Sequence, residues 1–209
     1  MILHGYFRSS ASWRVRIALA LKGLAAEQRF HHLRKGEQRA PDYLALNPQG
    51  LVPALELDGD VSLTQSLAII EYLEESHPTP ALLPGDPVQR ARIRAFAQVI
   101  ACDVHPIQNL KILARLRALD HDDAVVNEWA RTTIAEGLEA CEALISKEKG
   151  PYCFGDTPTL ADVCLIPQLG NAERFGVDIA WPRIQEAAAA CAALPAFQQA
   201  APDQQPDAE

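Results

Sequence analysis

One proline-rich segment divides this sequence into two parts with different secondary-structure patterns. The segment is HPTPALLPGDP, residues 77–87, with four prolines and one glycine, a composition typical of a linker. Before it, short strand-like and helix-like runs alternate, and after it nearly every pattern is helical. The chain is therefore predicted to fold as a small α/β domain at residues 1–78, a linker at 79–86, and an all-helical domain at 87–209.

The first part predicts a mixed sheet with helices on its faces. Its elements follow the order β-α-β-α-β-β-α, starting with the strand MILHGYF and the helix at residues 12–22. Asp58-Gly59 separates PALEL from DVSL and is a strong hairpin turn signal. A βαβ unit followed by an antiparallel hairpin and a helix at residues 65–76 gives such a sheet.

Four apolar periodic runs predict the helices of the second part. They span residues 88–119, with a bend or break near Pro106, and residues 124–146, 160–175 and 183–194. Thr159-x-x-Asp162 comes directly before one of these runs and is typical of a capping box that starts a buried helix. The polar tail QQAAPDQQPDAE is expected to fray.

Composition restricts the classes of partner. The net charge of -8 argues against nucleic acid or an anionic membrane as the main partner, because both attract basic surfaces. No apolar run approaches the roughly 18 residues that span a bilayer, and the first residues lack a secretory pattern. The five cysteines include no C-x-x-C pair, so we expect buried thiols in a reducing cytoplasm, without disulfides or a metal site.

Three serines stand where the first predicted strand gives way to a helix, in RSSASWRVRIALALKG, residues 8–23. A helix N-terminus carries unpaired amide donors and partial positive charge, which stabilise an anion such as a thiolate. The stretch contains no cysteine, so such a thiol would belong to a bound cofactor. Simple capping of the helix by Ser9, Ser10 and Ser12 also accounts for the pattern, and both interpretations stand at this point.

Two more local features favour a binding site in the first domain. Pro53 lies at the start of a predicted strand, and a cis Val52-Pro53 bond would expose the Val52 backbone to an extended peptide. Gln65-Ser66 begins the next helix, whose N-terminal amides and hydroxyl suit a carboxylate. Together with the serines, these features predict sites for a thiolate, a peptide edge and a carboxylate.

The sequence resembles the glutathione S-transferases, with a thioredoxin-like domain followed by their helical domain. More narrowly, SSASWRVRIALALKG, ALNPQGLVPAL, QSLAIIEYLEE, DTPTLADVCLIPQ and NAERFGVD resemble the zeta class. The resemblance covers nearly the whole chain. It implies glutathione as cofactor, a cytoplasmic homodimer, and maleylacetoacetate isomerase activity, with maleylpyruvate isomerase in bacterial relatives.

The resemblance also implies roles for particular residues. Ser9 would face the glutathione sulfur, supported by Ser10. The remaining glutathione contacts would come from Gln38, Val52 with Pro53, Gln65, Ser66, His105, Asn109 and Lys111. His105 and Asn109 are four residues apart, which predicts a shared helix face. Arg8 and Arg174 are candidates for the substrate carboxylates, because guanidinium binds carboxylates bidentately.

The implied reaction is a cis–trans isomerisation of an anionic cis-enedioic keto acid. The thiolate adds to the conjugated double bond, the resulting single bond rotates, and elimination returns the trans isomer. The signature departs from the class at Ala11, where a cysteine is usual, so any role of that thiol is absent. A general glutathione transferase and a non-catalytic binding module remain as alternatives.

Overall fold

The computed structural model describes residues 1–59 and 61–209. Its contacts separate two compact units, one built from Met1–Leu82 together with Ala192–Glu209 and the other from Leu83–Cys191. We call these unit 1 and unit 2 and describe each by itself. Among the described residues, no helix has the length and apolar character required to cross a membrane.

Unit 1 contains the expected mixed sheet. Its strands are β1 (Ile2–Gly5), β2 (Glu27–Phe30), β3 (Ala54–Glu56) and β4 (Ser62–Thr64), in the spatial order β2-β1-β3-β4. β1 runs parallel to β2 and antiparallel to β3, so Leu3 lies opposite both Gln28 and Leu55. β3 and β4 pair antiparallel, which confirms the hairpin predicted around Asp58-Gly59.

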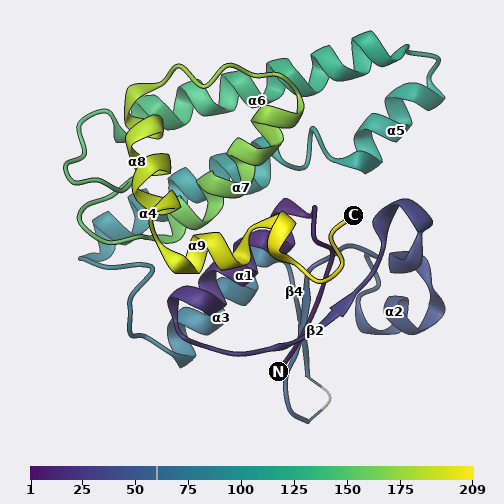
Figure 1. Ribbon diagram of the computed structural model, residues 1–209, viewed down its shortest axis with the longest axis horizontal. Helices are drawn as coiled ribbons and strands as arrows, with labels where there is room; N and C mark the ends of the chain where they lie inside the picture. The colour runs from purple at the N-terminus through teal and green to yellow at the C-terminus, as the bar shows by residue number, and fades with distance from the viewer. Residues whose placement is uncertain (60) are drawn as a thin grey trace. The chain divides into compact units, whose positions relative to one another are not determined.

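Helices lie on both sides of this sheet. Figure 1 shows α1 (Ser10–Leu21) and α3 (Ser66–Ser76) on one side of the strands and the short α2 (Pro41–Leu46) on the other. α1 and α3 pack together through an apolar seam, because their spacing places aliphatic side chains on facing stripes. The fully buried aliphatic side chains of these two helices include Val15, Ile17, Ile69, Ile70 and Leu73.

The final segment belongs to unit 1, although the sequence placed residues 87–209 in one helical domain and predicted a frayed tail. α9 (Pro195–Ala200) packs against α1, and the 3₁₀ turn η4 (Pro202–Gln204) follows it. Phe197 is 3% exposed, and Arg16 Nε donates to the Ala200 carbonyl at 3.0 Å. The segment is ordered because its partners lie far back in the chain, where a local polar pattern gives no indication of them.

The longer elements of unit 2 are all helices. They are α4 (Pro87–Gln98), α5 (Leu110–Ala118), α6 (Asp123–Ile145), α7 (Leu160–Arg174) and α8 (Pro182–Ala192). The run predicted at residues 88–119 is interrupted by a π-helical segment, η3 (Val99–Val104). α6 packs closely on this segment at Gly137, where a Cβ would overlap with Val104 Cγ2.

Four of the five cysteines are buried in unit 2, as expected, and Cys102 is exposed. Burial raises the pKa of the Cys141 thiol to about 12. Burial also raises the pKa values of Cys153 and Cys191, with a further contribution from the nearby Asp162 carboxyl. These three thiols therefore remain protonated and behave as small hydrophobic side chains.

Candidate functional site

The N-terminus of α1 presents Ser9 as its cap. The Ser9 amide donates to the Tyr6 carbonyl at 3.0 Å, and its Oγ accepts from the Ser12 amide at 3.2 Å. Ser9 is half-buried, whereas Ser10 and Ser12 are buried. A hydroxyl that accepts a capping bond still has its own proton to donate. Capping and stabilisation of a thiolate are thus compatible roles for Ser9.

The residue that precedes α3 has a strained backbone conformation. Gln65 has a φ of 70°, a region that non-glycine residues rarely adopt and that is found disproportionately at binding sites. Its Nε2 donates to Gln49 Oε1 at 2.8 Å. Ser66 is 6% exposed, and its Oγ accepts from Arg14 Nη1 at 3.3 Å. The first amides of α3 and these side chains form a site suited to a carboxylate.

The segment before β3 contains a cis peptide bond and is held by side-chain hydrogen bonds. The Val52-Pro53 peptide bond is cis, the condition under which the sequence predicted an exposed peptide edge at Val52. The preceding Leu51 carbonyl accepts from the Tyr43 hydroxyl and from Asn47 Nδ2, both at 2.7 Å. These bonds hold the backbone that leads into Val52.

Gln38 lies in the 3₁₀ turn η2 (Glu37–Arg39). Its Nε2 donates weakly to the Leu33 carbonyl at 3.4 Å. Its Oε1 is buried and has no hydrogen-bond partner among the residues that the structure describes. An unpaired buried acceptor costs free energy unless a ligand donor satisfies it. With the N-termini of α1 and α3, this acceptor fits a peptide ligand that carries amides, a thiol and carboxylates, as glutathione does.

The remaining predicted glutathione residues belong to unit 2. His105 directly follows η3, and Asn109 caps α5 by accepting from the Lys111 amide at 3.2 Å. The two side chains meet, with Asn109 Nδ2 3.5 Å from His105 Nε2, but they do not share one helix face as predicted. The chain turns between them, at Pro106, because proline disfavours continuation of a helix. Lys111 is exposed.

The two arginines proposed for substrate carboxylates lie in different units. Arg8 is half-buried and follows Phe7 in the turn that leads to Ser9, in unit 1. Arg174 is exposed and is the last residue of α7, in unit 2.

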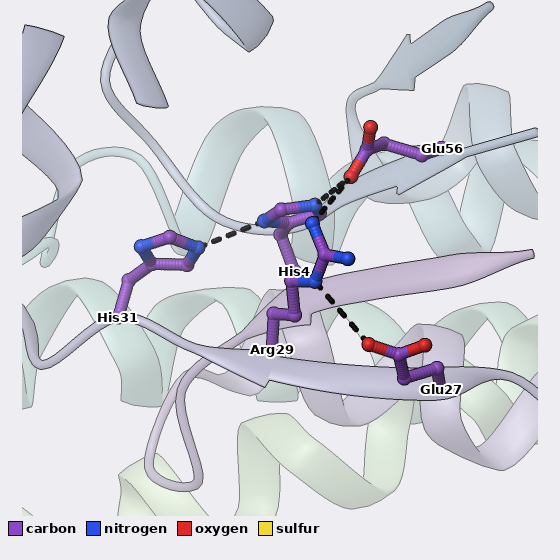
Figure 2. Close-up of polar contacts among 5 residues, drawn as sticks. All are labelled: His4, Glu27, Arg29, His31 and Glu56. Atoms are coloured by element: carbon purple, nitrogen blue, oxygen red, sulfur yellow. Dashed lines mark hydrogen bonds and ion pairs between the residues drawn. The ribbon is translucent and has the colours of Figure 1, made fainter. Parts of the chain in front are cut away.

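A second polar cluster in unit 1 was not identified from the sequence. Figure 2 shows His4 between His31 and Glu56, with His4 Nδ1 2.8 Å from His31 Nε2 and His4 Nε2 2.5 Å from Glu56 Oε1. Burial, and next the charge on His4, lower the pKa of His31. The ring of Tyr43 also packs on both histidines. Strand register brings these residues together, so the sequence pattern alone could not reveal the cluster.

Comparison with known proteins places the chain in a family. Residues 8–76 match the N-terminal domain model of glutathione S-transferases, and residues 88–194 match the C-terminal domain model. A maleylacetoacetate isomerase from Pseudomonas aeruginosa is 53% identical over 99% of this chain and 98% of its own length.

Two solved structures resemble the whole chain. A bacterial zeta-class maleylpyruvate isomerase in its holo form is 50% identical, with a TM-score of 0.97 and complete coverage of both chains. A maleylacetoacetate isomerase from Methylobacterium extorquens AM1, solved with malonate and glutathione, is 41% identical, with a TM-score of 0.96 and complete coverage of both chains. The chain belongs to the glutathione S-transferase family and, within it, to the zeta class.

Proposed function

We propose that this protein is a glutathione-dependent isomerase that converts maleylacetoacetate to fumarylacetoacetate. The observation that carries the proposal is the N-terminus of α1, where Ser9 caps a helix whose first turn contains no acidic residue. Such a helix end stabilises a bound thiolate. The high identity to a maleylacetoacetate isomerase over nearly the whole chain supports the choice of reaction.

Each part of unit 1 has a defined task in this proposal. Ser9 donates a hydrogen bond to the thiolate, and the buried Ser10 supports the same helix end. The backbone of Val52, before Pro53, pairs with the peptide of glutathione, while Gln65 and Ser66 hold its γ-glutamyl carboxylate. Gln38 binds the glycyl end of glutathione. When bound, glutathione supplies the thiol that adds reversibly to the double bond of the substrate.

Unit 2 supplies polar side chains to the same ligands in this proposal. His105, Asn109 and Lys111 bind glutathione. Arg174, with Arg8 of unit 1, binds the carboxylates of the substrate, because guanidinium pairs with carboxylate bidentately. The malonate bound with glutathione in the M. extorquens relative supports recognition of a dicarboxylate. We also propose that the protein is a cytoplasmic homodimer, as the family resemblance implies.

Maleylpyruvate is the second candidate substrate. The observation in its favour is the TM-score of 0.97 to a maleylpyruvate isomerase. Both compounds are dianionic maleyl keto acids, so the same carboxylate contacts serve either one. Initial rates with each substrate at equal glutathione concentration will rank them. Failure to isomerise either compound, with glutathione binding retained, would instead favour a binding module.

The carboxylate contacts are tested with Arg174→Ala and Arg8→Met. Each variant is expected to lower kcat/KM for the dianionic substrate by about 1.5 to 3 decades, because a bidentate contact that is desolvated on substrate binding contributes about 2–4 kcal/mol. Glutathione affinity should change far less. Conjugation of a neutral aromatic electrophile provides the control and should barely respond. Equal losses with both substrates would assign the arginines to folding or cofactor binding.

A further inference from the structure

The turn that carries Ser9 is held from within by one backbone bond. Residues 6–9 close it, with the Ser9 amide donating to the Tyr6 carbonyl at 3.0 Å. Ser9 is also the residue from which α1 starts. The conformation of this turn therefore determines where the Ser9 hydroxyl lies, and any group that holds the turn influences that position.

Two charged side chains hold the peptide groups of Phe7, in the middle of this turn. Arg16 Nη2 donates to the Phe7 carbonyl at 3.0 Å. Asp207 Oδ2 accepts from the Phe7 amide at 2.9 Å. Arg16 is 6% exposed. Its burial lowers its pKa to about 10, while the negative charge of Asp207 acts in the opposite direction. Asp207 thus accepts a hydrogen bond from the turn itself. Its negative charge also stabilises the Arg16 guanidinium, which binds the Phe7 carbonyl.

We propose that Asp207 is a positioning residue for the thiol site, by which we mean the N-terminus of α1 where Ser9 is proposed to bind the glutathione thiolate. It fixes the Phe7 amide, balances the buried charge of Arg16, and so orients the turn from which Ser9 presents its hydroxyl. This inference rests on the proposed function of Ser9. Asp207 would thereby position a residue of the N-terminal part of unit 1, although it lies 200 positions after Phe7 in the sequence.

The same final segment reaches the loop that carries Gln38. Glu209 Oε1 lies 2.6 Å from His32 Nε2. His32 begins the 3₁₀ turn η1 (Leu33–Lys35), where its Nδ1 accepts from the Lys35 amide at 3.2 Å. The turn with Gln38 follows directly. The final segment therefore contacts two of the loops that are proposed to bind glutathione.

Asp207→Ala, Asp207→Asn and the control Asp203→Asn test this role. Asp203 carries the same charge in the same segment, is exposed, and accepts from the neighbouring Gln204 side chain. Asp207→Ala is expected to lower kcat/KM for maleylacetoacetate about tenfold, the size of one lost charge-assisted hydrogen bond. Asp207→Asn should lower it about threefold, since an amide oxygen still accepts from Phe7. Asp203→Asn should match the wild type.

Two further measurements separate positioning from folding. In Asp207→Ala the acid limb of the pH–rate profile should move to higher pH, because a displaced hydroxyl stabilises the thiolate less. Hydrogen exchange of the amides in residues 6–12 should also accelerate in the ligand-free protein. Wild-type kcat/KM and exchange in Asp207→Ala would overturn the proposal. It would equally be overturned by an activity loss that follows the folded fraction while the acid limb stays in place.

The proposed function fails in a different way. If the wild-type protein isomerises neither maleyl substrate, both the proposed function and the positioning role of Asp207 are overturned. If the wild type is active and the Asp207 variants match it, the positioning role alone is lost.

Discussion

Two helix N-termini in this protein share a pattern but treat negative charge in opposite ways. α7 starts with Thr159-x-x-Asp162, and its capping box is formed, with Asp162 Oδ2 accepting from the Thr159 amide at 2.8 Å. α1 starts with Ser9-x-x-Ser12 and has no acidic residue in its first turn. A helix start that contains its own carboxylate is closed to external anions, whereas one without a carboxylate leaves its positive end for a ligand.

The environment of Asp162 shows how complete this closure is. The residue is 0% exposed, and its Oδ1 also accepts from the Cys153 amide at 2.9 Å. Burial raises the pKa of the Asp162 carboxyl, and the bonds from Cys153 and Thr159 oppose this shift. The carboxylate therefore holds unit 2 together at the start of α7, whereas the start of α1, which has no such carboxylate, is free to serve the proposed thiolate.

The largest expected effect is on stability, and it follows from replacing the carboxylate of the α7 capping box with a serine, as in Ser9-x-x-Ser12 of α1. Asp162→Ser should lower the free energy of unfolding by about 3–5 kcal/mol, because four buried donors lose their acceptor. The donors are the Thr159 amide and hydroxyl, the Cys153 amide and, more weakly, the Cys191 thiol. Urea unfolding measures the change, and Asp178→Ser, at an exposed acid of the same unit, is the matched control. A loss below about 1 kcal/mol would mean that the box is dispensable.

Ser9→Ala should instead affect the rate more than the stability. Loss of one hydrogen bond to a charged group costs about 1.5–3 kcal/mol, which lowers turnover at neutral pH by roughly one to two decades. Loss of the cap should cost about 1 kcal/mol of stability. The pH–rate profile should shift to higher pH. The control is Ser76→Ala, whose hydroxyl donates within α3. An unchanged profile would transfer the role to Ser10 or to the helix end.

Ala11→Asp places a carboxylate in the first turn of α1, one position before Ser12, which is the counterpart of Asp162 in α7. Ala11 is 9% exposed. We expect the Kd for glutathione to rise about tenfold, since the new charge repels the thiolate. Ala11→Asn has the same size without the charge and should have a smaller effect. Calorimetric titration of both variants decides the point, and equal losses would attribute the effect to side-chain volume.

The smallest effect is expected for Ala11→Cys. Isomerisation should stay within about threefold of the wild type, because the thiol that reacts belongs to glutathione. The new thiol at a helix N-terminus should be acidic, so the variant should become sensitive to alkylating electrophiles. Turnover before and after iodoacetamide treatment measures both effects. A many-fold gain in turnover would show that a protein thiol takes part in the reaction.

Local patterns predicted much of the fold, including the helix starts at which Ser9 and Ser66 lie. The α7 capping box, the hairpin at Asp58-Gly59 and the Ser9 cap all depend on residues within a few positions of one another. The π-helical segment at Val99–Val104 was not predicted. Its wider turn changes apolar spacing by less than one residue per turn, so the periodic run continues through it.

Contacts between distant residues account for the remaining differences. The His4–His31–Glu56 cluster depends on strand register, which the sequence alone does not fix. The ordered tail depends on Phe7, 200 positions before Asp207, and on Arg16, 184 positions before Ala200. Polar residues such as Asp207 are typical of a solvated chain end, and only the structure shows that Asp207 contacts the Phe7 amide.

The discontinuous construction of unit 1 has a consequence for synthesis on the ribosome. Met1–Leu82 emerges first, but Ala192–Glu209 completes the unit only after all of Leu83–Cys191 has been translated. At roughly 5–20 residues per second, the interval lasts on the order of 5–20 seconds. Throughout it, Arg16 lacks the Ala200 carbonyl and Phe7 lacks Asp207. The turn that precedes Ser9 therefore gains these two contacts only after Ala200 and Asp207 have been translated.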